Sequence, residues 1–96
     1  MATILIVDDN PTNREFIMSL LGYYGHRVLE AKDGAEGLRV VHSENPDLII
    51  ADILMPTMNG FELVRKLRED PKTASTRVVF YSATFLEEET RVVAQA

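Results

Sequence analysis

The sequence predicts an α/β fold, in which helices cover both faces of a parallel sheet. Three short segments are almost wholly apolar, at residues 4–7, 48–51 and 78–81. A strand that is apolar on both faces is typical of a parallel sheet buried between helices. Apolar residues recur at helical spacing between these segments. The resulting order βαβαβαβα favours right-handed crossovers and a parallel sheet.

The first helix should begin directly after the first strand. Asn10 can cap it, and Pro11 suits the first helical position, where a backbone N–H has no partner. Apolar residues then follow from Ile17 at positions i, i+3, i+4 and i+7, and Gly25 is suited to end the helix. A weaker apolar run at residues 27–31 indicates an outer strand of the same sheet.

The second helix is also marked at both ends. Asp33 and Glu36 have the spacing of a capping box, with Asp in place of the usual Ser or Thr. Pro46 follows the helical pattern and cannot continue it. We therefore expect a helix between the second strand and the apolar strand at residues 48–51.

Two further helices complete the predicted pattern. The third should begin near Gly60 and place Phe61, Val64 and Leu67 on one face. The fourth should begin near Leu86, after the strand at residues 78–81. The chain is thus expected to contain four βα units.

Composition limits the class of protein. The chain has 96 residues, which suits one domain, and its 46% hydrophobic and 26% charged residues indicate a globular protein. A net charge of -5 argues against direct binding to nucleic acid. No apolar run approaches the roughly 20 residues that span a bilayer, and no signal peptide is evident at the N-terminus. The absence of cysteine excludes disulfides and thiolate metal sites, and we expect a cytoplasmic protein.

The three most apolar strands end in polar side chains. Asp8 and Asp9 follow the first strand, Asp52 follows residues 48–51, and Ser82 and Thr84 follow the last strand. Ligands of open α/β sheets bind outside the carboxyl ends of the strands. We therefore expect these side chains to converge on one site.

Three neighbouring carboxylates repel one another unless they share a cation. Mg²⁺ fits best, because it binds few carboxylates and leaves positions open for phosphate oxygens. Zinc is disfavoured, since the chain lacks cysteine and His26 and His42 are isolated. A carboxylate beside Mg²⁺ can attack phosphorus and form an acyl phosphate. Structural roles compete with this interpretation, because a single aspartate at a strand end often caps a helix; Asp9 could do so, although Asn10 already serves.

Three segments resemble the signature segments of the response-regulator receiver domain, in the family's order and spacing. They are ILIVDDNPTNR, DLIIADILMPTMNGFEL and VVFYSAT. The resemblance covers the whole chain, 1–96, as one receiver domain. It implies a flavodoxin-like fold with sheet order 2-1-3-4-5. It also implies a signalling module of a two-component phosphorelay that is not an enzyme.

The resemblance implies roles for the acidic residues. Asp52 would be the phosphoacceptor and would receive its phosphoryl group from a phosphohistidine on a histidine kinase or histidine phosphotransfer protein. Asp9 would bind Mg²⁺ directly, and Asp8 often acts through water. Asp52 and the backbone carbonyl of Leu54 would complete the protein ligands.

The resemblance also implies how phosphorylation is read. Ser82 matches the family's switch hydroxyl, which would pass the signal to the fourth strand and helix. Ala83 matches the small residue that leaves room for the phosphoryl group. Asn59 stands where many members have Asp.

The family pattern also includes a fifth strand and helix, with a Lys at the end of that strand. The chain ends at Ala96, so we expect a C-terminally truncated receiver domain without its last βα unit. Lys32, Lys66 and Lys72 lie in the wrong segments to replace the family Lys. An alternative is therefore a fragment with impaired phosphorylation that serves in self-association or docking.

Self-association is expected at the edge of the sheet. Without a fifth strand, the apolar segment at residues 78–81 would lie at the edge, where it could pair with another chain and form a homo-oligomer. A third function, an Asp-nucleophile phosphatase, is disfavoured. Such enzymes generally need a second Asp two residues after the nucleophile, where this chain has Leu54.

Overall fold

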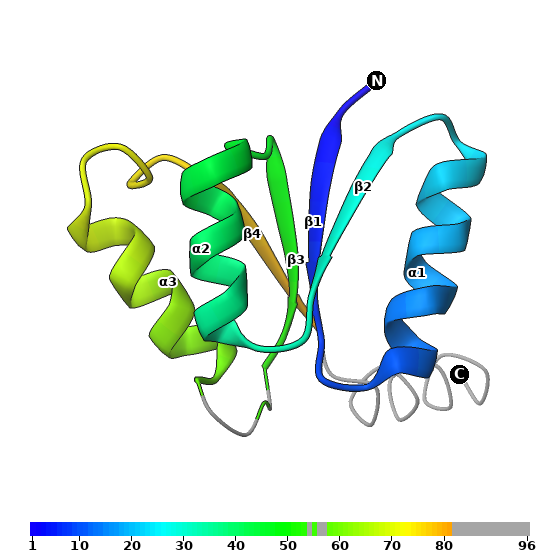
Figure 1. Cartoon of the computed structure of the whole chain (residues 1–96). Coiled ribbons are helices and arrows are strands. Elements are labelled where there is room, and N and C mark those ends of the chain that lie inside the picture. Colours follow the sequence, from blue (N-terminus) through cyan, green and yellow to red (C-terminus); the bar gives the residue numbers. More distant parts are fainter. Residues whose placement is uncertain (54, 56–57, 82–96) are drawn as a thin grey trace, which may run out of the picture.

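The computed structural model describes residues 1–53, 55 and 58–81. This part of the chain alternates strand and helix, as predicted (Figure 1). The elements are β1 (Thr3–Val7), α1 (Pro11–Tyr23), β2 (Arg27–Ala31), α2 (Gly34–Glu44), β3 (Leu48–Asp52), α3 (Gly60–Glu69) and β4 (Arg77–Tyr81). The helix expected near Leu86 falls outside the described residues.

The strands form one parallel sheet in the order β2-β1-β3-β4. β1 lies between its two neighbours, with Val7 level with Ala31 of β2 and Ala51 of β3. β4 pairs with β3 so that Asp52 lies opposite Tyr81. The order agrees with the first four strands of the expected 2-1-3-4-5 sheet. Since all strands run the same way, their carboxyl ends meet at one edge.

The three helices of the described residues cover the two faces unequally. α1 lies on one face of the sheet, and α2 and α3 lie side by side on the other (Figure 1). The apolar core is concentrated between the sheet and the α2–α3 layer, whereas α1 buries no residue completely. The core residues are Leu5, Val7, Ala31, Val41, Ile49, Ala51, Met55, Leu63 and Leu67. None of the described helices is long and apolar enough to cross a membrane.

The predicted helix starts are confirmed by their hydrogen bonds. The Asn10 side chain accepts from the backbone N–H groups of Thr12 and Asn13, at 2.9 and 3.2 Å. Asp33 accepts from Glu36 N–H at 2.8 Å and caps α2. These bonds satisfy N–H groups that have no partner within the helix.

The predicted apolar face of α3 was right at Leu67 and wrong at Phe61. Phe61 was expected on the buried face, but its side chain is 60% exposed and its ring lies 5.1 Å from that of Phe80. The buried residues are Gly60, Leu63 and Leu67. Their spacing of three and then four residues matches one face of a helix. Because Phe61 is apolar, the sequence pattern had favoured a face that includes Phe61 over the face that includes Gly60 and Leu63.

Candidate functional site

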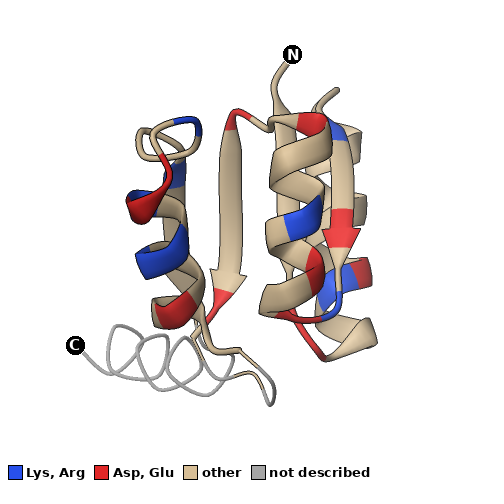
Figure 2. Ribbon diagram, turned by 60° about the vertical axis from the view of Figure 1, so that its left-hand side comes forward, with Lys and Arg blue, Asp and Glu red and all other residues tan. Residues whose placement is uncertain are grey.

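Three carboxylates meet at the carboxyl edge of the sheet. Asp8 and Asp9 follow β1, and Asp52 is the last residue of β3, which is the neighbour of β1. One oxygen from each side chain lies within 4.8 Å of the others. In Figure 2 some of the acidic positions lie at this lower edge, and others lie on the helices and at the upper end of the molecule. We call these three residues the acidic cluster, and its formation confirms the convergence expected of the carboxylates.

The members of the acidic cluster differ in their access to water. Asp8 is fully buried, Asp52 is 9% exposed, and Asp9 is exposed. Two buried carboxylates beside a third carry a cost in repulsion and lost hydration. A site of this kind is favourable when other groups compensate the negative charge.

Both the side chain and the backbone of Asp8 are hydrogen-bonded. Its Oδ1 accepts from the backbone N–H of Asn10 at 2.8 Å, and its Oδ2 accepts from the Tyr81 hydroxyl. Its own N–H donates to the carbonyl of Ala31 at 3.1 Å, which ties the turn to β2. The Arg14 guanidinium donates to the carbonyl of Asp8 at 2.7 Å. The turn between β1 and α1 is thereby fixed through both backbone and side chain.

Tyr81 was not predicted as a site residue. It is the last residue of β4, and its side chain is only 9% exposed. Burial raises the pKa of the Tyr81 phenol well above its ordinary value, and the hydrogen bond to Asp8 and the charges of the acidic cluster raise it further. The phenol therefore remains protonated and acts as a donor. A polar-tipped side chain at the end of an apolar strand, opposite Asp52, was the signal that could have revealed it.

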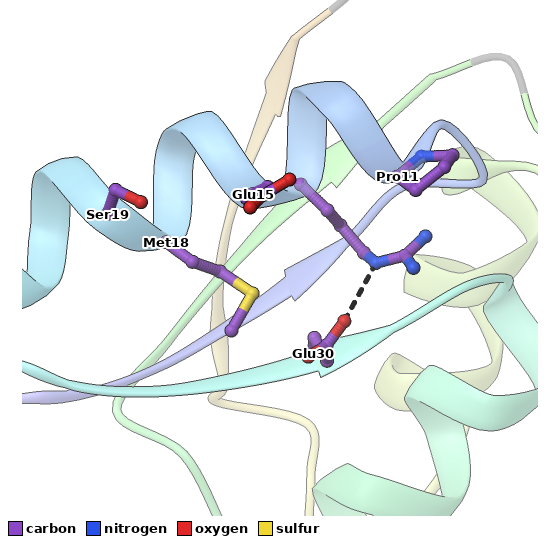
Figure 3. A pocket seen from close by; sticks show the side chains of 6 residues that line it. Pro11, Glu15, Met18, Ser19 and Glu30 are labelled. Carbon is purple, nitrogen blue, oxygen red and sulfur yellow. Dashed lines mark hydrogen bonds and ion pairs between the residues drawn. The ribbon is translucent and has the colours of Figure 1, made fainter.

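Arg14 links the site to β2 and to a surface pocket. Its Nε lies 3.0 Å from Oε1 of Glu30. The dashed line in Figure 3 marks this ion pair. The Arg14 side chain is mostly buried, whereas that of Glu30 is half exposed. An ion pair of this exposure contributes little stability, so its main effect is to orient Arg14 toward the Asp8 carbonyl. The pocket is lined by Pro11, Arg14, Glu15, Met18, Ser19 and Glu30.

Gly60 packs closely against the end of β3 and against Phe80. A Cβ atom at this position would lie 2.9 Å from the carbonyl oxygen of Asp52 and 2.8 Å from Cε1 of Phe80. Its N–H donates to the carbonyl of Ile53 at 3.1 Å, and Ile53 N–H donates to the carbonyl of Tyr81 at 2.9 Å. The sequence placed the start of the third helix near Gly60, and the structure adds that the absence of a Cβ atom there permits this close approach.

The comparisons identify the family. The model of the response regulator receiver domain matches residues 4–96. The chain belongs to this family. The receiver domain is 42% identical to the protein PilH of Pseudomonas aeruginosa over 79 residues, which cover 82% of this chain and 65% of PilH. It is 51% identical to the sensor protein EvgS of Escherichia coli over 67 residues, or 70% of this chain and 6% of EvgS.

Solved structures agree with this assignment. The receiver domain resembles the chemotaxis protein CheY4 of Vibrio cholerae with a TM-score of 0.79 and 32% identity, over 96% of this chain and 80% of that one. A response regulator receiver protein from Pseudomonas putida matches with a TM-score of 0.80 and 28% identity, over 97% and 78% of the two chains. The predicted flavodoxin-like α/β class is thus confirmed. The receiver domain spans less than two thirds of PilH and a small part of EvgS.

Some predicted site residues cannot be placed. Leu54, Ser82 and Ala83 lie outside the described residues, so their roles as metal ligand, switch hydroxyl and small neighbour stay predictions. Met55, next to Leu54, is described and is buried in the core.

The acidic cluster could hold a metal ion. Its ligand atoms are all carboxylate oxygens, the donors preferred by hard divalent cations. A cation would also offset the repulsion between Asp8 and Asp52, both of which are buried. The residues therefore fit a metal of this class.

Proposed function

We propose that this receiver domain is the phosphoacceptor module of a two-component phosphorelay, with Asp52 as the acceptor. The observation that carries the proposal is the acidic cluster at the carboxyl edge of a receiver fold, with three carboxylates within 4.8 Å of one another. Asp52 ends the central strand β3, and Asp8 and Asp9 approach it from β1. The proposed acceptor carboxylate and two further carboxylates thus lie in one site.

The reaction is a transfer from nitrogen to oxygen. An Asp52 carboxylate oxygen forms a bond to phosphorus while the bond from phosphorus to the donor's imidazole nitrogen breaks. The electron pair of the broken bond stays on the imidazole, and Asp52 becomes an acyl phosphate. Bound Mg²⁺ would supply charge neutralisation and positioning, which dominate catalysis of phosphoryl transfer.

The protein's own residues prepare this step. Asp9 and Asp8 would hold Mg²⁺ together with Asp52, and the family resemblance adds the carbonyl of Leu54. Asn10 and Arg14 keep the turn bearing Asp8 and Asp9 in place through hydrogen bonds of 2.8 and 2.7 Å. Rigid placement of ligands lowers the cost of assembling the site.

The donor class follows from the proposed chemistry. A histidine kinase or histidine phosphotransfer protein would supply the phosphohistidine. The similarity to segments of a sensor protein and of a protein named as a histidine kinase supports this partner class. The Ser82 hydroxyl would respond to the phosphoryl group, and the small side chain of Ala83 would leave room for it. The module would act in the cytoplasm.

A small phosphodonor tests the proposal. Incubation with acetyl phosphate and Mg²⁺ should increase the mass of the protein by one phosphoryl group, and Asp52→Asn should abolish the increase. Asp47→Asn is the matched control, because Asp47 lies at the other end of β3 and accepts from Thr3 N–H at 2.8 Å. It should be phosphorylated like the wild type. No mass increase in the wild type at any Mg²⁺ concentration would refute the proposal.

Docking or self-association is a second candidate function. Within the described part of the chain, β4 lies at the edge of the sheet, and its Val79 side chain is 53% exposed. An exposed apolar edge strand favours pairing with another chain. Light scattering at tens of micromolar separates the two outcomes: a homo-oligomer supports this candidate, and a stable monomer contradicts it.

A further inference from the structure

Tyr81 lies between two different environments. Its hydroxyl donates to Oδ2 of Asp8 in the acidic cluster. Its ring lines an apolar groove on the α1 side of the sheet, together with Ile17, Leu21 and Ile50. The hydroxyl is therefore directed at Asp8 without any bound ligand.

Asp8 has a particular need for this donor. Its side chain is fully buried, so water does not compensate its charge, and the other two carboxylates of the acidic cluster add repulsion. Among the described residues, the donor to Oδ1 is the N–H of Asn10 at 2.8 Å and the donor to Oδ2 is the Tyr81 hydroxyl. Hydrogen bonds to a charged acceptor are stronger than those between neutral groups.

A donor to a metal-ligating carboxylate can act in two opposite ways. It can orient the carboxylate, which increases metal affinity. It can also stabilise the negative charge of the metal-free carboxylate, which decreases metal affinity, because a bound cation withdraws charge from the acceptor and weakens the hydrogen bond. Orientation matters little here, since complete burial and the Asn10 N–H already fix Asp8. Charge stabilisation should therefore dominate.

We propose that the Tyr81 hydroxyl sets the cation affinity of the acidic cluster by acting as a neutral donor that stabilises the metal-free Asp8 carboxylate. The inference rests on the proposed function of the cluster as a divalent-cation site. Tyr81 acts through Asp8 and touches no reacting atom, so it is not a catalytic residue. Its effect is to keep cation binding weaker, and hence more reversible, than the three carboxylates alone would make it.

Calorimetric titration with Mg²⁺ tests the proposal. Tyr81→Phe keeps the ring in the groove and removes only the hydroxyl. It should bind Mg²⁺ roughly three- to tenfold more tightly than the wild type, because part of a charged hydrogen bond no longer has to be given up. Tyr23→Phe, at an exposed tyrosine of α1, is the matched control and should bind Mg²⁺ with unchanged affinity. Unchanged or weaker binding by Tyr81→Phe would overturn the proposal.

Urea unfolding provides a second readout by thermodynamic linkage. Tyr81→Phe should have a smaller free energy of unfolding than the wild type in a chelator. Saturating Mg²⁺ should reduce this difference by RT times the logarithm of the ratio of the two Mg²⁺ dissociation constants. A purely structural role of Tyr81 predicts the same gap with and without Mg²⁺, which would contradict the inference.

If Tyr81→Phe does not fold, the tyrosine absorption spectrum of the wild-type protein tests the inference instead. The chain has three tyrosines and no tryptophan, and Tyr23 and Tyr24 are exposed. Mg²⁺ should therefore perturb the tyrosine absorption spectrum through Tyr81, and a spectrum without change would overturn the inference. If the wild type is phosphorylated and binds Mg²⁺ but these readouts fail, only this inference is wrong. If it neither binds Mg²⁺ nor is phosphorylated, the proposed function fails with it.

Discussion

Replacement of Gly60 by alanine should destabilise the receiver domain and displace the backbone at Asp52. The added Cβ would lie 2.9 Å from the Asp52 carbonyl oxygen and 2.8 Å from Cε1 of Phe80. The Phe80 ring can shift. The backbone at Asp52 can move only if the pairing of β3 with β4 is disturbed. Overpacking of this kind costs about 1–3 kcal/mol. The better helix propensity of alanine offsets less than about 1 kcal/mol of this cost.

Gly22→Ala is the matched control for this substitution. Gly22 lies within α1, and a Cβ there would meet no atom within 4 Å. Its replacement should therefore stabilise the protein by roughly 0.5–1 kcal/mol. Urea unfolding followed by circular dichroism measures both changes. If Gly60→Ala proves as stable as Gly22→Ala, the close approach of α3 to β3 does not constrain position 60, and the reasoning is refuted.

Two further predictions concern the start of α1 and the end of β4. Asn10→Ala removes the acceptor of two N–H groups of α1 and should cost about 1 kcal/mol in urea unfolding; an unchanged midpoint would contradict the capping role. Because the pKa of Tyr81 is raised in the folded state, its contribution to stability is complete below the ordinary tyrosine pKa of about 10 and is lost as the pH rises above it. Wild type should lose more stability than Tyr81→Phe between about pH 9 and pH 11; equal losses would refute this sign.

Local patterns in the sequence were sufficient for the strands and most helix ends. The strands predicted at residues 4–7, 27–31, 48–51 and 78–81 agree with β1 to β4 within one residue at each end. Buried parallel strands are visible because both faces are apolar, and cap residues are visible because they act on N–H groups two or three positions away. The convergence of the carboxylates followed from topology, since parallel strands end at one edge.

Contacts between distant residues were beyond these patterns. The hydrogen bond from Tyr81 to Asp8 joins residues 73 positions apart, and nothing in either local segment specifies it. The bond from Arg14 to the Asp8 carbonyl depends on how α1 lies over β2, where Glu30 holds the guanidinium. Phe61 shows the same limit, because its apolar side chain fits the core by composition but lies outside it.

By itself, therefore, the sequence determined the order of strands and helices, the acidic residues at the carboxyl edge and the resemblance to receiver domains, because these depend on short-range patterns and on the handedness of βαβ units. Only the tertiary structure decided that Asp8 is fully buried and bonded to Tyr81, and that Gly60 leaves room for the backbone of Asp52. Burial and close approach arise from packing between segments far apart in the chain. They are the features that set the electrostatic balance of the site.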